Sequence, residues 1–208
     1  MICVSIVEKN IDKCLEILKK CEMAELRFDR ILPKKSEIKR LLTFKIPIIA
    51  TCRNGFYNDE QRLEILTEAI KNGATYVDIE IDSTEEYLQK LIVIANCYNC
   101  KIIISYHNFI ETPDENFLER IIIEAEKYNP YLIKIVTIAR TLADVERVIF
   151  LQQQKKKIIA FAMGEHGKIS RLLSYDCGAP FIYAAYTHDS KSAEGQLTVD
   201  EIKKFFEP

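Results

Sequence analysis

The amino-acid sequence predicts an α/β protein of the (β/α)8 barrel class, with eight parallel strands surrounded by helices. Eight short runs rich in β-branched apolar residues recur along the chain, and segments with helical periodicity separate them. Eight such strand–helix units are the number that closes a barrel. The length of 208 residues is near the lower limit for this fold and sufficient for one sizeable core. We therefore expect residues 1–208 to form a single barrel domain.

The runs that we interpret as buried parallel strands are apolar along most of their length. They occupy residues 2–6, 24–28, 47–51, 75–81, 101–106, 131–136, 157–162 and 180–185. An open doubly wound sheet is the main alternative, and its first turn is usually rich in glycine. The segment SIVEKN at the end of the first run has no glycine, and the whole chain has 6. The composition thus favours the barrel and gives little support for a phosphate-binding loop.

Two of the intervening segments show helical spacing most clearly. The apolar face of residues 59–72 consists of Leu63, Leu66, Ala69 and Ile70, and that of residues 114–128 consists of Phe117, Leu118, Ile121, Ile122 and Ala125. Three hydroxyl residues precede a glutamate by three positions, the spacing of an N-terminal capping box: Ser83–Glu86, Thr112–Glu115 and Thr198–Glu201. Pro113 suits a first helical position, and Gly73 suits a helix end.

Composition and charge narrow the classes of function. Apolar residues make up 48% and charged residues 29% of the chain, which is typical of soluble globular proteins. The formal net charge of −2 arises from 29 basic and 31 acidic residues, so we expect no nucleic-acid or membrane partner. No apolar run approaches the roughly 18 residues of a membrane helix, and the start MICVSIVEKN lacks the features of a signal peptide.

The cysteines indicate a compartment rather than a site. Their odd count of 7, without a secretion signal, favours reduced thiols and a cytoplasmic protein. Cys97 and Cys100 have the spacing of half a zinc site, but no second cysteine pair or histidine pair with ligand spacing accompanies them. We therefore expect no metal site and interpret these two thiols as part of a helix end.

Polar side chains gather where the runs end, which in a (β/α)8 barrel is the edge that carries the active site. The residues placed there are Glu25, Arg27, Asp29, Arg53, Asp78, Glu80, Asp82, His107, Lys134, Met163, Arg171, Ser192 and Gln196. Some of them have a structural interpretation, because buried Glu–Arg pairs are common inside barrels. Asp78, Glu80 and Asp82 alternate at period two and so face one side. We interpret these three as a supporting network that Arg27 or Lys134 neutralises.

Lys134 is the residue that points to chemistry. It lies inside the apolar run YLIKIV, where an ammonium costs several kcal/mol unless it is paired or loses its proton. At an inner strand position near Arg27, Arg53 and Arg171, desolvation and like charge both favour the neutral amine. A neutral amine attacks a ketone or aldehyde to form a Schiff base, and the protonated imine then makes an adjacent C–H acidic.

His107 and the arginines complete this interpretation. An imidazole near its reference pKa of about 6.5 exchanges protons in both directions at neutral pH, so His107 is the expected base. The arginines are suited to a carboxylate, which they bind bidentately where geometry allows. Together these residues predict imine chemistry on a carbonyl-bearing carboxylic acid, which leaves several lyases and aldolases open.

Seven short motifs occur in an order that is specific, although each is weak alone. They are VSI, ELRFD, TCR, SYHNF, IKI, AMGEHGKISR and SAEGQ, and they contain Ser5, Glu25, Arg27, Asp29, Arg53, His107, Lys134, Met163, Arg171, Ser192, Ala193 and Gln196. With this ordered set the chain resembles type I 3-dehydroquinate dehydratase over nearly its whole length. The separation of His107 and Lys134 is also similar to that in the family.

The resemblance implies a homodimeric barrel lyase of the shikimate route to aromatic amino acids, where it would catalyse the third step without metal or organic cofactor. It implies that Lys134 forms an imine with the C3 ketone of 3-dehydroquinate. His107 would take a proton from C2 and pass one to the departing C1 hydroxyl. This syn-elimination yields 3-dehydroshikimate and water.

The resemblance also implies which residues bind the substrate. Arg171 with Gln196 would hold the carboxylate and hydroxyls, and four residues would bind ring hydroxyls: Glu25, Arg27, Arg53 and Ser192. The other implied contacts are Ser5, Met163, Tyr183 and Ala193, with support from Asp29, Asp78 and Glu80. Residues 186–196, YTHDSKSAEGQ, resemble the family's mobile loop, and their small polar side chains suit a lid.

One departure from the family pattern affects His107. The family has a glutamate four positions after the TxR arginine, followed by two glycines, and that glutamate contacts the catalytic histidine. Here the position is Tyr57 and the loop is shorter. Either Glu60 or Glu80 replaces the glutamate, or His107 has lost its orienting carboxylate. Tyr183 is a milder change, at a position where the family commonly has phenylalanine.

Two other hypotheses stay open at this point. Another Schiff-base lyase, such as a barrel aldolase, would also use Lys134, although the ELR motif and the Arg171–Gln196 set favour a polyhydroxylated ring acid over a sugar phosphate. A catalytically silent barrel that binds a metabolite or partner is supported by the missing glutamate at position 57.

Overall fold

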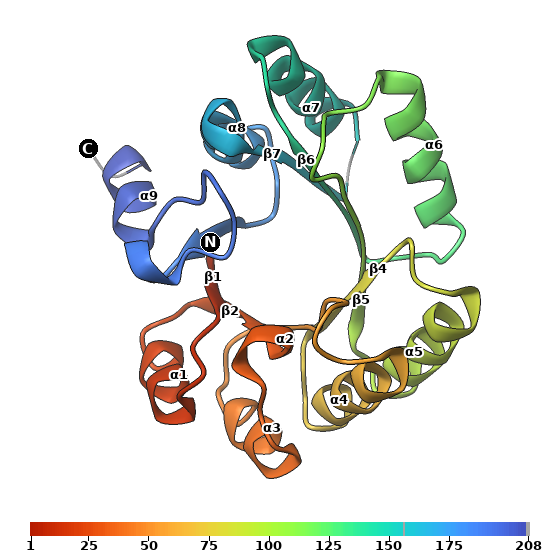
Figure 1. Ribbon diagram of the computed structural model, residues 1–208, viewed down its shortest axis with the longest axis vertical. Coiled ribbons are helices and arrows are strands. Elements are labelled where there is room, and N and C mark those ends of the chain that lie inside the picture. The colour runs from red at the N-terminus through yellow and green to blue at the C-terminus, as the bar shows by residue number, and fades with distance from the viewer. Residues whose placement is uncertain (156, 207–208) are drawn as a thin grey trace.

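The structure is a computed structural model that describes residues 1–155 and 157–206. Eight parallel strands curl around a common centre, and helices cover their outer face (Figure 1). The strands are β1 (Ile2–Ile6), β2 (Met23–Arg27), β3 (Ile48–Thr51), β4 (Tyr76–Glu80), β5 (Lys101–His107), β6 (Leu132–Ile138), β7 (Ile158–Met163) and β8 (Ile182–Ala185). Their order is β7-β6-β5-β4-β3-β2-β1-β8, and within the described residues no ladder joins β7 to β8. This order confirms the (β/α)8 class and excludes the doubly wound sheet.

Helices follow the strands on the outside of the sheet. They are α1 (Ile11–Leu18), α2 (Phe28–Ile31), α3 (Lys35–Leu41), α4 (Asp59–Lys71), α5 (Glu85–Cys97), α6 (Glu115–Glu126), α7 (Leu142–Gln154), α8 (Gly164–Asp176) and α9 (Val199–Phe206), with a 3-10 turn η1 (His188–Ser190) after β8. The buried face of α4 begins with Arg62 rather than with the predicted Leu63, which is half-buried. None of the helices in residues 1–155 and 157–206 is long and apolar enough to cross a membrane.

Two of the three predicted capping boxes are wrong. Helix α5 is capped by Thr84, whose hydroxyl accepts from the amide of Tyr87, instead of by Ser83. Helix α6 is capped by Asp114, which accepts from the amide of Phe117 at 2.8 Å, so Pro113 precedes the cap. The Thr112 hydroxyl is unavailable as a cap because it bonds to β6, at 2.7 Å from the Thr137 hydroxyl and 2.9 Å from the Ile138 carbonyl.

The third capping box, Thr198–Glu201, and the predicted helix end at Gly73 are confirmed. The amide of Thr198 donates to Glu201, whose own amide donates back to the Thr198 hydroxyl. Gly73 has a φ of +99° and directly follows Asn72, the C-cap of α4. A residue with this φ is rarely anything but glycine, so the helix stops there.

The interior of the barrel changes from apolar to polar along the strands. Its lower part is a buried cluster that includes Cys3, Met23, Ile49, Ile103 and Leu132. Two residues further along the same strands stand Ser5, Glu25, Thr51, Ser105 and Lys134, which are also buried. Side chains on a strand alternate, so both sets face the same interior. The apolar layer closes the bottom of the barrel, and the polar layer lies where the strands end.

Candidate active site

A cavity of about 910 Å³ opens at the C-terminal ends of the strands. The structure brings nearly all of the predicted residues together around it: Ser5, Glu25, Arg27, Asp29, Arg53, Glu80, Asp82, His107, Lys134, Met163, Arg171, Tyr183, Ser192, Ala193 and Gln196. Asp78 lies behind this lining with a fully buried side chain. Tyr57 and Glu60 lie outside the lining.

Lys134 projects from β6 into the cavity and is 5% exposed. Its Nζ lies 3.1 Å from Oδ2 of Asp78 and 3.7 Å from Oε1 of Glu25. The Tyr183 ring centre is 4.3 Å from the same Nζ. The prediction that like charges dominate the surroundings of this amine is therefore wrong. Two carboxylates balance the charge of Lys134. They lie on β2 and β4, which are distant from Lys134 in the sequence.

Hydroxyl groups from neighbouring strands hold Glu25 in place. The Ser5 hydroxyl on β1 donates to Oε2 at 2.7 Å, and the Thr51 hydroxyl on β3 donates to Oε1 at 2.9 Å. Both oxygens of Glu25 thus have a fixed partner before any ligand is present. The carboxylate is positioned to face Lys134 without freedom to rotate.

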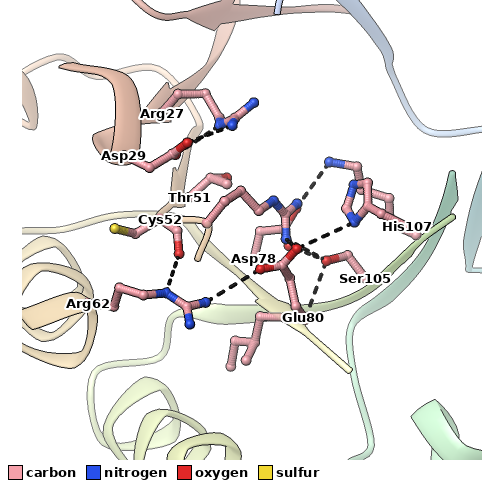
Figure 2. Close-up of polar contacts among 12 residues, drawn as sticks. Arg27, Asp29, Thr51, Cys52, Arg62, Asp78, Glu80, Ser105 and His107 are labelled. Atoms are coloured by element: carbon pink, nitrogen blue, oxygen red, sulfur yellow. Dashed lines mark hydrogen bonds and ion pairs between the residues drawn. The ribbon is translucent and has the colours of Figure 1, made fainter. Parts of the chain in front are cut away.

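Asp78 is the most heavily paired group of the site. Its Oδ2 accepts from Arg53 at 2.7 Å and from Lys134 at 3.1 Å, and its Oδ1 accepts from the Ser105 hydroxyl at 2.6 Å. Burial by itself raises the pKa of this carboxyl, but Arg53 and then Lys134 together hold its pKa well below the usual range. Asp78 is therefore an anion at neutral pH. Figure 2 shows Asp78 and Ser105 within this network.

His107 ends β5 and lines the same cavity, with its ring stacked on Phe109 at a centroid distance of 6.0 Å. Burial first, and then the positive charges of Arg53 and Lys134, lower the pKa of His107 well below its usual value. The imidazole is therefore neutral at neutral pH and able to accept a proton. This corrects the expected pKa near the reference value, because the fold surrounds a buried ring with cations.

Glu80 lies closer to His107 than the alternative candidate does. Its Oε1 is 3.9 Å from Nδ1 of His107. Glu60, in contrast, is exposed in the first turn of α4. The Glu80 carboxylate also faces two guanidinium groups, with 3.4 Å from Oε1 to Nη1 of Arg53 and 3.5 Å from Oε2 to Nη2 of Arg62.

The predicted run of three carboxylates on one face is wrong for its last member. Strand β4 ends at Glu80, so the alternation of side chains applies to Asp78 and Glu80 only. Asp82 lies in the turn that follows and is exposed at the mouth of the cavity. It makes no ion pair with another described residue.

Arg171 differs from the other cations of the site. It lies on α8, is 4% exposed, and its guanidinium carbon is 4.4 Å from the centre of the Phe161 ring. Its Nε and Nη2 atoms are buried without a hydrogen-bond partner in the part of the chain that the structure describes. Burial lowers the pKa of Arg171 to about 10, so the group remains charged at neutral pH. A buried, unpartnered guanidinium that lines a cavity is suited to an anionic ligand.

Arg27 and Asp29 form a bidentate pair at the rim. The Arg27 Nε lies 3.0 Å from Oδ1 of Asp29, and Nη2 lies 2.7 Å from Oδ2. Burial by itself lowers the pKa of Arg27, but the hydrogen bonds to Asp29, together with the negative charges of Glu25 and Asp29, raise the pKa overall. The pair fixes the guanidinium plane at the edge of the cavity, in keeping with the supporting place expected for Asp29.

The predicted lid segment, residues 186–196, is bonded to itself on one side of the cavity. Both the amide and the hydroxyl of Ser192 donate to Oε1 of Gln196, at 2.7 Å and 3.0 Å. Gly195 has a φ of +70°, and a Cβ there would stand 2.5 Å from the carbonyl oxygen of Gly164. The end of the segment therefore packs tightly on the first residue of α8.

Three residues of the network were not predicted from the sequence: Thr51, Ser105 and Arg62. Thr51 and Ser105 precede Arg53 and His107 by two positions, so period two places them on the same strand face. That spacing was a usable signal for both. Arg62 carried a signal as well, since it precedes Leu66 by four residues and so lies on the apolar face of α4.

The chain is similar to known proteins of one family. A sequence model of the family described as Type I 3-dehydroquinase matches residues 2–207 of the chain. The 3-dehydroquinate dehydratase of Pyrococcus abyssi is 34% identical over 211 residues, which cover 98% of this chain and 95% of that relative. The 3-dehydroquinate dehydratase of Methanococcus maripaludis strain C7 is 35% identical over 218 residues, which cover 98% of this chain and 97% of the relative.

Solved structures agree with this result. The crystal structure of the 3-dehydroquinate dehydratase from Aquifex aeolicus has a TM-score of 0.85 and 28% sequence identity, and the match covers 100% of both chains. A type I 3-dehydroquinate dehydratase from Clostridium difficile, crystallised with covalently modified comenic acid, has a TM-score of 0.86 at 23% identity. That match covers 98% of this chain and 89% of the other and shows the shared fold.

Proposed function

The chain belongs to the type I 3-dehydroquinase family, and we propose that it converts 3-dehydroquinate to 3-dehydroshikimate and water through an imine on Lys134. One observation carries the proposed mechanism: the buried amine of Lys134 and the neutral imidazole of His107 line the same cavity. The proposal takes residues 1–208 as one catalytic barrel domain in the shikimate route to aromatic amino acids.

The first step is attack on the substrate ketone. After Nζ of Lys134 has lost its proton, it adds to C3, and the carbonyl oxygen leaves as water to form a protonated imine. Asp78 and Glu25, at 3.1 Å and 3.7 Å from Nζ, stabilise the positive charge that the imine nitrogen retains. The cationic imine withdraws electrons, and the C–H bond at C2 becomes acidic.

The second step is the elimination. His107 accepts the C2 proton, and the electron pair forms the C1–C2 double bond as the C1 hydroxyl departs. The imidazolium gives this proton to the hydroxyl while the C1–O bond breaks, so the group leaves as water. Hydrolysis of the imine consumes one water and releases the product, so the net reaction loses one water. No organic cofactor or metal enters this balance.

Substrate binding would use the rest of the lining. The unpartnered guanidinium of Arg171 supports a role in binding the carboxylate, and Gln196 of the lid segment lines the same cavity. We assign the ring hydroxyls to Glu25, Arg27, Arg53 and Ser192, with Ser5, Met163, Tyr183 and Ala193 completing the contacts. Asp29, Asp78 and Glu80 hold the arginines of this set in place through ion pairs.

Reductive trapping tests the mechanism. Borohydride added in the presence of 3-dehydroquinate should leave a stable mass adduct that peptide mapping places on Lys134. Lys134→Ala should lose both the adduct and turnover, whereas Lys101→Ala, at the opposite end of the neighbouring strand β5, should keep both. Turnover without an adduct would contradict the imine. Tight binding of 3-dehydroquinate without product would favour the silent barrel.

The proposal includes a cytoplasmic homodimer. All seven cysteines are free thiols, which supports a reducing compartment. The dimer follows from the family resemblance, and sedimentation equilibrium over a range of protein concentrations tests it. A mass of one chain at every concentration would contradict it.

A further inference from the structure

We propose that Glu80, held by Arg62, is the positioning residue of His107. In this arrangement the Glu80 carboxylate selects the imidazole tautomer with the proton on Nδ1 and leaves Nε2 free to accept the substrate proton. The kinetic part of this inference rests on the proposed function, and the tautomer does not.

The Nδ1 atom of His107 needs a partner. This atom is buried and has no hydrogen-bond partner among the described residues. A neutral imidazole carries its proton on one of two nitrogens, and the surroundings decide which. The nearest charged acceptor is Oε1 of Glu80, at 3.9 Å, within reach of a small rotation of either side chain. A buried N–H without an acceptor costs free energy, so a hydrogen bond from Nδ1 to Glu80 would stabilise this tautomer.

The other charged groups around the ring cannot take this part. Arg53 and Lys134 are donors only. Asp78 already accepts from Ser105 on one oxygen and from Arg53 and Lys134 on the other. Each oxygen of Glu80 faces one guanidinium group at 3.4 Å or 3.5 Å, and Oε1 accepts no hydrogen bond from Arg53. Oε1 can therefore accept a hydrogen bond from the imidazole.

Arg62 explains why Glu80 stays in this position. It is 3% exposed on the inner face of α4, where an apolar side chain would be the ordinary choice. Its Nε donates to the Cys52 carbonyl at 3.0 Å, and its Nη1 donates to Asp59 at 2.9 Å. Its guanidinium also lies over the Tyr87 ring at 4.8 Å. The Cys52 carbonyl and the Tyr87 ring hold the guanidinium plane, whereas the Asp59 side chain is 52% exposed, and the remaining nitrogen Nη2 faces Oε2 of Glu80.

The two guanidinium groups thus hold the carboxylate from both sides. Arg53 lies next to Oε1 and Arg62 next to Oε2, at 3.4 Å and 3.5 Å. Without Arg62, the carboxylate of Glu80 would turn fully onto Arg53 and away from His107. Figure 2 shows Arg62 and His107 on opposite sides of the Glu80 and Asp78 carboxylates. Position 57 carries a tyrosine outside the cavity lining, so that loop supplies no competing carboxylate.

The test compares Glu80→Gln and Arg62→Met with the matched control Asp59→Asn, which removes the other carboxylate partner of Arg62. The first readout is the pair of ¹⁵N chemical shifts of the His107 ring in the ligand-free protein. We expect the Nδ1–H tautomer in the wild type and in Asp59→Asn. We expect a mixed or inverted population in Glu80→Gln and in Arg62→Met. Dominant Nε2–H in the wild type, or unchanged shifts in both variants, would overturn the inference.

The second readout is kinetic. For both variants we expect kcat to fall about 10- to 100-fold with KM changed less than about threefold, because the base and not the binding site is affected. Borohydride trapping on Lys134 should persist, since amine attack does not use the His107 tautomer. A rise in KM with kcat unchanged would overturn the positioning role. Arg62→Lys, which keeps the charge, should recover part of kcat.

The outcomes separate this inference from the proposed function. If wild-type protein neither turns over 3-dehydroquinate nor traps it, the proposed function fails, and the ¹⁵N shifts still decide whether Glu80 sets the tautomer. If Arg62→Met does not fold by circular dichroism, Glu80→Gln carries the test alone.

Discussion

The two sides of the cavity differ in whether their charged side chains have a partner. The side built by β2 to β6, here the paired wall, consists of Glu25, Arg53, Asp78, Ser105 and Lys134. The side built by β7, α8 and β8, here the open wall, consists of Phe161, Met163, Arg171 and Tyr183. On the paired wall each charge meets a counter-charge within 3.7 Å. On the open wall two guanidinium nitrogens have no partner in the described chain.

This difference separates chemistry from recognition. A network that is complete before substrate arrives leaves little reorganisation for the reaction itself, so the paired wall is suited to hold reacting groups. A buried cation without a partner gains charge-assisted hydrogen bonds when an anion reaches it, so the open wall is suited to select a carboxylate. Under the proposed function the substrate thus supplies the partner that the open wall lacks among the described residues.

His107→Ala should have the largest effect, because it removes the base that faces the paired wall. We expect kcat to fall about 10³- to 10⁴-fold, the upper range for loss of a general base. Borohydride should still trap the imine on Lys134, as mass spectrometry would show. His166→Ala, an exposed histidine on α8, is the matched control and should retain full turnover.

Asp78→Asn breaks the paired wall. Removal of this anion leaves Arg53 and Lys134 buried without their shared partner, so the free energy of unfolding should fall by about 3–5 kcal/mol. Urea denaturation measures it. Asp82→Asn, in the turn after β4, should change the free energy by about 0.5 kcal/mol at most. An equal effect of the two variants would show that the network is no more than a surface feature.

Arg171→Met should separate the two walls most clearly, because stability and activity move in opposite directions. Removing an unpartnered buried charge should raise the free energy of unfolding by about 1 kcal/mol. Loss of the carboxylate partner should lower kcat/KM about 100-fold. Lys168→Met, from the same helix but at its exposed face, controls for charge loss. Destabilisation of Arg171→Met would mean that the open wall is paired in solution.

The pH dependence of stability tests the neutral state of His107. The unfolded chain takes up the His107 proton below about pH 6.5, whereas the folded chain does not, because its pKa is depressed. The unfolded state therefore binds more protons as the pH falls, and stability declines by up to about 1.4 kcal/mol per pH unit. Urea denaturation between about pH 7 and pH 5 should show a smaller slope in His107→Gln. Equal slopes would contradict a depressed pKa.

Gly195→Ala should have the smallest effect. The new Cβ would approach the Gly164 carbonyl oxygen to 2.5 Å in a backbone with φ of +70°, so the lid segment must shift. We expect KM to rise about threefold with a stability loss of about 1 kcal/mol. Gly178→Ala has a φ of +99° and open space, and should lose stability with KM unchanged. An unchanged KM in both variants would separate the segment from substrate binding.

Several features of the site follow from local sequence alone. Each predicted strand lies within two residues of its observed range, because a run of β-branched apolar residues is suited to burial on both faces. Period two places Lys134 two residues after the apolar Leu132 on an inner face, and the same rule places Glu25 after Met23. Helix starts were less certain, since Thr112 used its hydroxyl on β6 instead of capping α6.

The sequence by itself determined the barrel class, the approximate bounds of its strands and which residues face its open end, since these depend on the number of strand–helix units and on periodicities within single elements. Only the tertiary structure decided the charge state of the site. Lys134 meets carboxylates from two other strands, His107 is buried among cations, and Arg62 enters the apolar face of α4 to reach Glu80. Electrostatic energies depend on distances of a few ångströms between separate elements, and those distances exist only after the sheet has curled and its register has formed.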